Sequence, residues 1–309
     1  MHGRLGIDLR HVPVHGAGAG VSHASVELAE ALIQLAVSRR QIELLNKKGG
    51  FLTVRKFIRD KKIDCLLVPS GAVPPFMNIP CFPWVHDVEI FEHPEWFDQS
   101  FLKRAITTRL FLRGIHRAPH IFTVSEDTKE KLVRMSGVAE QRITVTYQGI
   151  KPIAPGSKKR YALILGSVNP RKNIPFIQQI WPEVQKRISD AELIIAGQPY
   201  MTFDDQERDE LIRHATVLLL PSFHEGFGRT ALEAMSAGVP VIASNRGAIP
   251  EVVGDAGRLY DPTDRHAWIE GIVSAFNDSL DGSRGMERSR LFSWDKTARI
   301  MLAKLEEYC

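Results

Sequence analysis

The sequence predicts an α/β protein built from two doubly wound halves. Its 309 residues amount to about twice the length of a typical domain. Short apolar runs alternate with amphipathic stretches along the chain, which is the pattern of strands and helices in parallel sheets. Between the halves, residues 151–160 read KPIAPGSKKR, rich in proline, glycine and lysine and poor in apolar side chains. Such a composition is typical of a linker, so we expect the first half to end near residue 152.

Each half supplies its own strands and helices in alternation. In the first half we expect strands at 5–9, 65–68, 82–86, 121–124 and 143–146, and helices at 22–35, 51–60, 101–115 and 126–135. In the second half we expect strands at 161–165, 193–196, 217–220, 239–243 and 257–259, and helices at 174–187, 206–214, 230–237, 265–276 and 294–307. Ligands of open α/β sheets bind at the carboxyl ends of the strands, so functional residues should follow these strands.

Composition and cysteine usage exclude several classes of protein. Hydrophobic residues make up 44% and charged residues 25%, which excludes disordered, collagen-like and coiled-coil chains. The three cysteines, Cys65, Cys81 and Cys309, are far apart, which argues against a disulfide framework and for a reducing compartment. The first residues show no apolar core of a signal peptide, and no apolar run reaches 18 residues. We therefore expect a cytoplasmic protein without a membrane-spanning helix.

The charge is distributed unevenly between the halves. Residues 1–155 carry 21 Lys and Arg against 15 Asp and Glu, a net charge of +6, whereas the remainder carries 19 against 21, a net charge of −2. A basic half attracts acidic partners, although a solvated surface of scattered charge is the alternative. No RNA-binding motif with interleaved aromatic residues appears, so we do not expect nucleic acid as a partner. We expect instead an anionic or lipid-phosphate-linked acceptor, with peripheral contact at the inner membrane face.

A glycine-rich loop follows the first predicted strand. It reads GAGAG at 16–20 and precedes the helix expected from residue 22. Glycines let backbone N–H groups approach an anion at a helix N-terminus, which makes Gly18 and Gly20 candidate ligand-binding residues. The spacing is G-x-G-x-G and lies six residues beyond the strand, unlike the dinucleotide fingerprint, so we do not expect NAD. A flexible turn without a ligand is the alternative.

Two further motifs follow predicted strands. His86 and Asp87 end the strand at 82–86, and they form either a polar catalytic element or a capping aspartate beside a structural histidine. Residues 166–173 read GSVNPRKN and precede the helix expected from residue 174. Arg171 and Lys172 at a helix N-terminus would bind a phosphate, whereas an ordinary surface pair is the alternative.

The longest motif is PSFHEGFGRTALEAMSAGVPVIAS at 221–244. Gly226 and Gly228 permit a tight turn, Glu225 lies on that turn, and Glu233 follows eight positions later on the expected helix. One carboxylate can thus contact a ligand directly while the other meets a neighbouring part of it. A glycosidase acid/base pair or a metal site are alternatives, but the absence of Asp-x-Asp disfavours a metal-held diphosphate.

Taken together, these motifs resemble the retaining GT4-type glycosyltransferases of the GT-B fold, and most of all their mannosyltransferase members. The likeness rests on EGFGRTALEAMSAGVPVIAS and GAIPEVVGDAGRLYDPTD, supported by GSVNPRKN, HDVEIFEHPEWF, IFTVSEDTKEKL, YQGI and FSWDKTARIML. It implies two facing Rossmann-like domains with a cleft between them. The acceptor-binding domain would span 1–152, the nucleotide-sugar-binding domain 153–292, and a helix at 293–309 would cross back to the first domain.

The resemblance also implies roles for individual residues. Glu225 matches the glutamate that holds hydroxyls of the donor sugar, and Glu233 matches the one that binds the ribose. Lys172 matches the lysine at the diphosphate, with Arg171 sharing that role because Ser167 stands where many members have arginine. His86 matches the histidine beside the reacting sugar. The remaining implied donor contacts come from the glycine loop and from backbone N–H groups, at Gly18, Gly20, Gly226, Phe227 and Gly228.

The implied reaction is transfer of a hexose, with retention, from a nucleotide-diphosphate sugar to a glycan or lipid-linked acceptor in cell-envelope or polysaccharide synthesis. We expect GDP-mannose in preference to UDP-sugars as the donor, no cofactor, no metal ion and no protein nucleophile. The domains look abbreviated: the connection between 197 and 217 is short where the family normally adds a strand and helix that often hold the base, and residues 35–41 are also shortened. A degenerate, non-catalytic member of the family and a sugar-nucleotide epimerase are therefore the alternatives.

Overall fold

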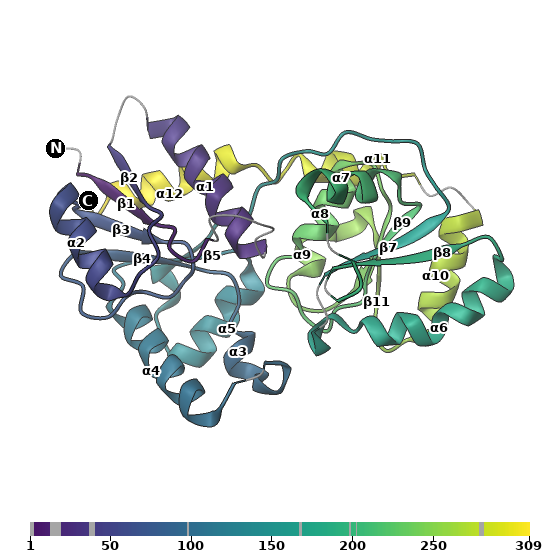
Figure 1. Cartoon of the computed structure of the whole chain (residues 1–309), viewed down its shortest axis with the longest axis horizontal. Coiled ribbons are helices and arrows are strands. Elements are labelled where there is room, and N and C mark those ends of the chain that lie inside the picture. Colours follow the sequence, from purple (N-terminus) through teal and green to yellow (C-terminus); the bar gives the residue numbers. More distant parts are fainter. Residues whose placement is uncertain are drawn as a thin grey trace. The chain divides into compact units, whose positions relative to one another are not determined.

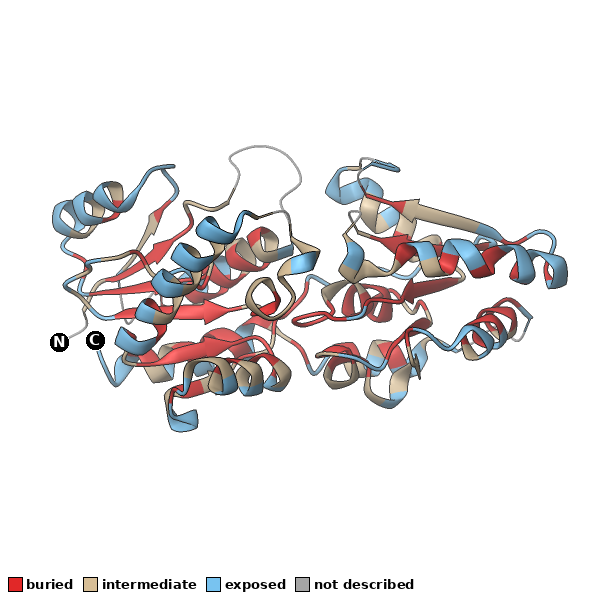
Figure 2. Ribbon diagram, turned by 90° about the horizontal axis from the view of Figure 1, so that it is seen from below, coloured by how far each residue is buried: buried red, intermediate tan, exposed pale blue. Residues whose placement is uncertain are grey.

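Two units of parallel strands and flanking helices make up the chain (Figure 1). The computed structural model describes residues 3–12, 20–36, 41–97, 99–166, 169–197, 199–201, 203–277 and 281–309. The first unit comprises Met1–Gly149 and Ser293–Cys309, and the second comprises Ile150–Phe292. Within each unit the buried residues concentrate in the strands and the inward faces of the helices (Figure 2).

The sheet of the first unit is parallel throughout its described strands. These are β1 (Leu5–Asp8), β2 (Ile42–Leu45), β3 (Cys65–Val68), β4 (Cys81–Val85), β5 (Ile121–Thr123) and β6 (Ile143–Val145). Their order across the sheet is β2-β1-β3-β4-β5-β6. Because β1 lies between β2 and β3, the direction of winding reverses there, which is where open α/β sheets bind ligands.

Helices flank this sheet, including one from the end of the chain. They are α1 (Gly20–Ala36), α2 (Phe51–Lys61), α3 (Glu89–Glu92), α4 (Phe101–Arg117), α5 (Glu126–Ser136) and α12 (Trp294–Glu306), with 3-10 turns at Pro94–Trp96 and Glu140–Arg142. Helix α12 packs against α1, and the indole of Trp294 donates a hydrogen bond to Glu27 at 3.0 Å. Gly149 is required at this crossing, since a Cβ there would lie 2.3 Å from the backbone nitrogen of Trp294.

The second unit has a shorter parallel sheet among its described residues. Its strands are β7 (Tyr161–Leu165), β8 (Glu192–Ala196), β9 (Val217–Leu220), β10 (Val241–Ser244) and β11 (Arg258–Tyr260), in the order β11-β10-β9-β7-β8. Strand β7 reads YALIL and is buried along its whole length, as expected for a parallel strand covered on both faces.

Two apolar cores lie on opposite faces of this sheet. One contains α6 (Ile174–Arg187) and α10 (Arg265–Asn277), with Trp268 fully buried. The other contains α7 (Asp205–His214), α8 (Arg229–Ser236) and α9 (Ile249–Val253), and α11 (Ser283–Ser289) packs on α8. Two 3-10 turns, Pro170–Lys172 and Gly254–Ala256, complete the unit.

The prediction of an α/β protein with parallel sheets is confirmed, with four elements that the sequence did not predict. These are β2, α3, α9 and α11. A fifth difference concerns the cysteines: Cys65 on β3 is bonded to Cys309 across 244 residues of sequence, and Cys81 is free and buried. The spacing of the cysteines gave no sign of this disulfide, so their number no longer supports a reducing compartment.

Candidate functional site

Most of the predicted donor-site residues lie at one edge of the second unit's sheet. Strand β7 has β8 on one side and β9 on the other, so the winding reverses between β7 and β9. Loops that follow these two strands leave the sheet at the same, carboxyl edge. The loop after β7 contains Arg171 and Lys172, and the loop after β9 contains Glu225.

The loop after β7 is shaped by its own polar residues. The side chain of Asn169 accepts a hydrogen bond from the backbone N–H of Arg171 at 2.9 Å, which caps the 3-10 turn Pro170–Lys172. The backbone N–H of Phe223, from the loop after β9, donates to the carbonyl of Arg171 at 2.8 Å. A backbone hydrogen bond thus connects the two loops, and it fixes the backbone positions from which their side chains extend.

Arg171, Lys172 and Glu225 form a charged cluster. These three residues and Ser222 are called here the donor cluster. The Nζ of Lys172 lies 2.7 Å from Oε1 of Glu225, and Nη1 of Arg171 lies 3.7 Å from Oε2. The hydroxyl of Ser222 donates to Oε1 at 2.6 Å. Glu225 is only 8% exposed, so this carboxylate is held by two cations and a hydroxyl group almost out of contact with water.

The surroundings of Glu225 keep it ionised. Burial alone would raise its pKa, but the charges of Lys172 and Arg171, with hydrogen bonds from Lys172 and Ser222, outweigh burial and lower the pKa from 4.5 to about 2. The residue is therefore an acceptor of hydrogen bonds across the physiological pH range. This fits a group that orients hydroxyls, and it does not fit a general acid, which needs a raised pKa.

The backbone of Glu225 leaves no room for a side chain at Gly247, which lies against it. Gly247 has a φ of +58°, and a Cβ there would lie 2.8 Å from the carbonyl oxygen of Glu225 and 2.7 Å from the ring of His224. That same carbonyl accepts from the N–H of Ala248 at 3.0 Å. The loop that follows β10 thus packs against the backbone of Glu225 and holds it in place.

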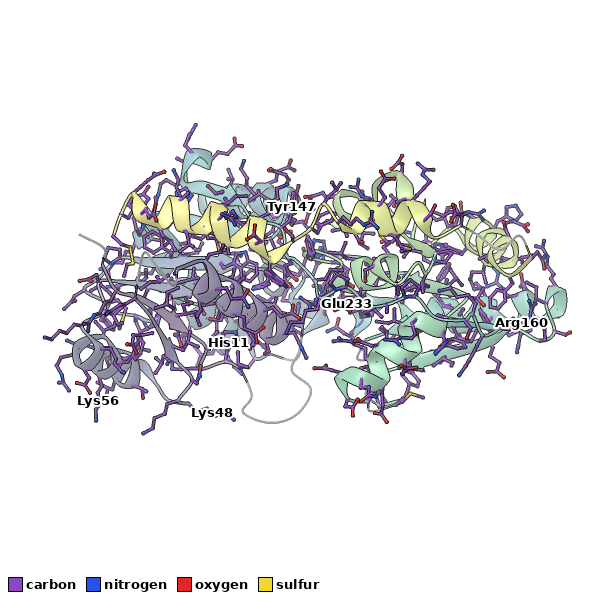
Figure 3. The ribbon with its side chains drawn as sticks, turned by 90° about the horizontal axis from the view of Figure 1, so that it is seen from above. His11, Lys48, Lys56, Tyr147, Arg160 and Glu233 are labelled. Atoms are coloured by element: carbon purple, nitrogen blue, oxygen red, sulfur yellow. A yellow bond between two sulfur atoms is a disulfide. The ribbon has the colours of Figure 1, made fainter. Side chains whose placement is uncertain are left out.

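Glu233 lies on α8, which begins after Gly228 with a φ of +96°. The residue, labelled in Figure 3, is 4% exposed. Its Oε1 accepts a hydrogen bond at 2.9 Å from Nε of Arg229, one helical turn earlier. Burial would lower the pKa of Arg208 on α7, but the carboxylates of Glu233, Asp209 and Asp205 together outweigh burial and raise it. Glu233 is therefore a buried carboxylate surrounded by cations, like Glu225.

The backbone segment between the two glutamates is buried as well. Gly226, Phe227 and Gly228 all lie below the surface, and the ring of Phe227 packs edge-on against Phe292 at 5.8 Å. The side chain of Phe227 thus belongs to the core of the second unit. Any contact that these residues make with a donor would come from their backbone N–H groups, as the resemblance in sequence implies.

The remaining predicted residues belong to the first unit. His86 follows β4; its Nε2 lies 2.9 Å from the carbonyl of Pro69, and its Nδ1 lies 3.1 Å from Nε2 of Gln148. A carbonyl can only accept, so the proton resides on Nε2 and Nδ1 accepts from the amide. Both ring nitrogens are thus engaged within the protein, as expected for the alternative of a structural histidine. A role of His86 beside the reacting sugar stays a prediction. Gly20 is exposed at the start of α1, and Gly18 lies outside the described residues.

Sequence reasoning missed three partners of the predicted residues: Ser222, Arg229 and Gln148. The first two had a visible signal, since Ser222 lies three residues before Glu225 and Arg229 lies one helical turn before Glu233. Gln148 had none, because 62 residues separate it from His86.

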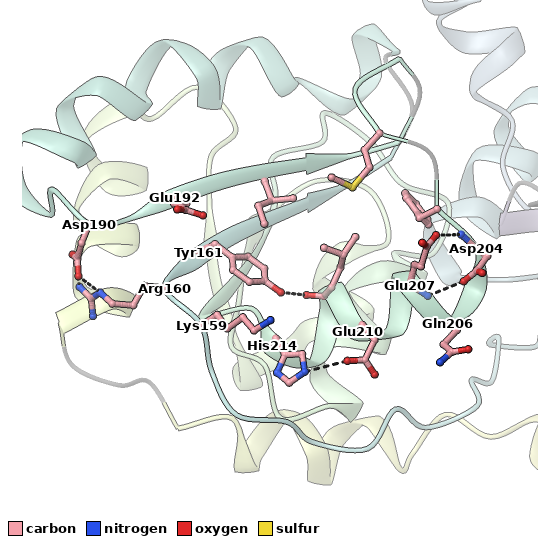
Figure 4. Close-up of a pocket in the computed structure, with 14 residues that line it drawn as sticks. Lys159, Arg160, Tyr161, Asp190, Glu192, Asp204, Gln206, Glu207, Glu210 and His214 are labelled. Carbon is pink, nitrogen blue, oxygen red and sulfur yellow. Dashed lines mark hydrogen bonds and ion pairs between the residues drawn. The ribbon is translucent and has the colours of Figure 1, made fainter.

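A wide cavity lies elsewhere in the second unit, along the edge strand β8. It has a volume of about 910 Å³ and is bordered by β8, the start of β7 and helix α7 (Figure 4). Its charged groups pair with one another, as in Arg160 with Asp190 and His214 with Glu210. Helix α7 is the one described helix between β8 and β9, so this groove lies where the connection is short. Arg160 and His214 are thus already engaged by carboxylates of the groove, and we expect the donor at the donor cluster instead.

The described residues offer neither a metal site nor a membrane-spanning helix. No group of three or more His, Cys, Asp and Glu side chains is arranged to hold a metal ion within the described ranges. None of the helices described is both long enough and apolar enough to cross a membrane. The expectation of a reaction without a metal ion stays a prediction.

Comparison with protein families gives two adjacent matches. Residues 21–152 match the model described as Glycosyltransferase Family 4, and residues 159–278 match the model described as Glycosyl transferases group 1. The boundary between the matches falls within the predicted linker at 151–160.

Curated relatives are distant and longer than this chain. The chain is 28% identical over 257 residues to O-antigen chain mannosyltransferase B of Escherichia coli, covering 68% of this chain and 66% of the relative. It is 28% identical over 210 residues to O-antigen chain mannosyltransferase RfbU of Salmonella typhimurium, covering 61% and 58%. The chain thus spans about three fifths to two thirds of the length of these relatives.

Solved structures extend the likeness to the whole chain at the level of the fold. Sucrose-phosphate synthase from Thermosynechococcus elongatus superposes with a TM-score of 0.76 at 17% identity, covering 99% of both chains. Anabaena HepE, in complex with UDP and glucose, superposes with a TM-score of 0.75 at 15% identity over 99% and 100%. The predicted GT-B fold is therefore confirmed, and with both family models matched, the chain belongs to the family 4 glycosyltransferases, the glycosyl transferases of group 1.

Proposed function

We propose that this protein transfers a hexose from a nucleotide-diphosphate sugar to a glycan or lipid-linked acceptor, with retention of configuration. The observation that carries this proposal is the donor cluster: one buried, ionised carboxylate held by two partly buried cations at the carboxyl edge between β7 and β9. A nucleotide-diphosphate sugar presents the matching chemistry, with an anionic diphosphate next to neutral hydroxyl groups.

The cations have a role in bond cleavage. As the bond between the anomeric carbon and the diphosphate breaks, negative charge accumulates on the leaving phosphate. Lys172 and Arg171 would neutralise that charge, and the nearby N-terminus of α8 would add the partial positive charge of its backbone N–H groups. Cations held in a poorly hydrated site stabilise such charge more strongly than they would in water.

The two glutamates have separate tasks. Glu225, ionised and paired with Lys172, would accept hydrogen bonds from hydroxyls of the sugar. Glu233, eight residues further along and paired with Arg229, would accept from the ribose. The resemblance also assigns a role in catalysis to His86, which belongs to the first unit. We assign no protein nucleophile, and the departing phosphate would take the proton of the acceptor hydroxyl.

The preferred donor is GDP-mannose. Support comes from the sequence likeness to mannosyltransferases, three of which are among the curated relatives. Several structural neighbours are described in complex with UDP or UDP-glucose, so UDP-sugars are the competing donors. The acceptor class follows the same relatives, two of which act on O-antigen chains.

The second candidate is a family member that binds nucleotide without catalysing transfer. It is favoured by the short connection between β8 and β9, which holds only α7 in the described part of the chain. A sugar-nucleotide epimerase is a third reading, distinguished by a changed sugar configuration without transfer.

The test is a donor panel with a matched pair of variants. GDP-mannose and a set of UDP-sugars are incubated with the full chain and candidate acceptor glycans, and release of nucleoside diphosphate is followed together with the sugar product. Lys172→Met should abolish release, whereas Lys186→Met, at an exposed lysine of the same unit, should not change it. Nucleotide binding without any release would favour the non-catalytic reading, and absence of both would contradict the donor cluster as a binding site.

A further inference from the structure

Helix α4 of the first unit exposes an unusual number of apolar side chains. Of its 17 residues only Gly114 and Ile115 are buried. Phe101 is 76% exposed, Leu102 69%, Ile106 53% and Leu110 45%. Scattered surface hydrophobic residues need no explanation, but Leu102, Ile106 and Leu110 recur every four residues and so align along the helix, and an exposed apolar row of this kind marks an interaction site.

The same helix is strongly basic. It contains five Lys and Arg residues and no Asp or Glu, the basic residues being Lys103, Arg104, Arg109, Arg113 and Arg117. Within the described part of the chain, no carboxylate comes within ion-pair distance of these five cations. Arg104 lies over the ring of Phe101 at 5.5 Å, and Arg113 lies over the ring of Phe76 at 5.2 Å. Arg104 is also near enough to Glu95 to contribute to lowering the pKa of that carboxyl, whereas the other four cations keep their charge available to an external anion.

Helical spacing places the two kinds of residue on one outward face. Leu102, Ile106, Arg109 and Arg113 follow one another at intervals of three and four residues, which aligns them along one side of the helix. The opposite side is anchored: Phe111 packs against Phe91 at 4.8 Å. The helix thus lies on the outside of its unit (Figure 1), and Leu102, Ile106, Arg109 and Arg113 are all exposed.

A hollow of about 490 Å³ lies beside this face. It is lined by two arginines, a hydroxyl group and apolar side chains, at Phe101, Arg104, Ala105, Thr108, Arg109 and Leu112. Its walls can receive an anionic group and the start of an apolar chain at the same time.

We infer that α4 docks the protein onto the surface of an anionic lipid bilayer. Aliphatic and aromatic side chains of such a helix enter the boundary between headgroups and acyl chains, while Lys and Arg contact lipid phosphates. A second copy of the chain is disfavoured as the occupant, because two faces with five cations each would repel one another. A nucleic acid is disfavoured because Leu102 and Ile106 would gain nothing from a phosphate backbone.

The test is co-sedimentation of the full chain with vesicles, without donor or acceptor, so that its outcome is independent of the proposed glycosyl transfer. Vesicles of phosphatidylcholine alone are compared with vesicles of about one-third phosphatidylglycerol, at low and high salt. We expect binding to the anionic vesicles only, at least tenfold above the neutral ones, and its loss at high salt.

Two double variants separate the contributions of charge and apolar surface. Arg109→Gln with Arg113→Gln should weaken binding roughly 30-fold, since each cation near an anionic surface contributes slightly more than about fivefold. Leu102→Ser with Ile106→Ser should weaken it by at least about tenfold through lost apolar burial. All four positions are partly or fully exposed, so the variants should fold, which circular dichroism checks.

The matched control removes two cations from another helix of the same unit. Arg55 and Lys56 are exposed on α2 (Lys56 is labelled in Figure 3), and Arg55→Gln with Lys56→Gln should leave binding within about twofold. An equal loss in this control would show that binding depends on the overall charge of the unit and not on α4, and it would overturn the inference. Equal binding to neutral and anionic vesicles, or binding to soluble RNA but not to vesicles, would overturn it as well.

Discussion

Replacing Glu225 by glutamine should destabilise the second unit in a way that depends on pH. The substitution keeps the size of the side chain and its bond from Ser222, but it removes the charge that faces Lys172 and Arg171. Each pKa unit corresponds to about 1.4 kcal/mol, so a pKa held at about 2 instead of 4.5 corresponds to about 3 kcal/mol of folding free energy at pH 7.

The sign follows from the direction of the pKa change. A carboxylate whose pKa is lowered by folding stabilises the folded state fully above its unfolded pKa, and that contribution disappears as the pH falls towards the folded pKa. The cost of Glu225→Gln should therefore be constant from pH 7 to about pH 5 and fall to roughly 1 kcal/mol at pH 3.

Native-state hydrogen exchange on peptides from β7 and β9 measures this cost within the second unit alone. The matched control is Glu192→Gln, at an exposed glutamate on β8, which should change the free energy of opening by less than about 0.5 kcal/mol. If Glu225→Gln costs no more than the control at pH 7, or costs the same at pH 7 and pH 3, the donor cluster does not hold an ionised carboxylate as described.

Three further predictions concern single residues. His86→Ala should lower kcat while nucleotide affinity stays within about threefold, and unchanged turnover would make it a structural histidine. Gly247→Ala forces a side chain into left-handed backbone against the carbonyl of Glu225, so we expect a loss of about 1–2 kcal/mol in hydrogen exchange and weaker donor binding. Cys309→Ser opens a covalent loop of 244 residues and should destabilise the first unit by up to about 5 kcal/mol. Titration of unfolded, unreduced wild type should then find one free thiol, Cys81, and three would contradict the disulfide.

Strands β7 and β9 of the second unit were predictable because their sequences are unbroken apolar runs. Strand β7, YALIL, has apolar side chains on both faces, which predicts a parallel strand covered on both sides. Every residue of it is buried in the structure. Strand β2 was not predicted, because its four residues include Glu43 and lie at the edge of the sheet, where burial is partial. A short edge strand carries little periodicity to distinguish it from a loop.

The donor cluster was predictable in its parts but not in its pairing. The sequence indicated Lys172 and Glu225 as separate ligands of a donor, each at the end of a strand. That they contact one another depends on β7 and β9 being neighbours, which is a property of the sheet order and not of either motif. For the same reason the bond between Cys65 and Cys309, formed across 244 residues, left no signal in the local sequence.

Calorimetric titration of the two glutamate variants with GDP and with GDP-mannose tests the central claim most directly. Glu233→Gln should weaken both ligands alike, by about 10- to 150-fold, since the ribose is common to them. Glu225→Gln should not weaken GDP, because Lys172 loses a competing carboxylate, but it should weaken the sugar nucleotide by at least about tenfold. Equal losses of GDP affinity in both variants, or no loss of either ligand in both, would contradict the assignment of the donor site.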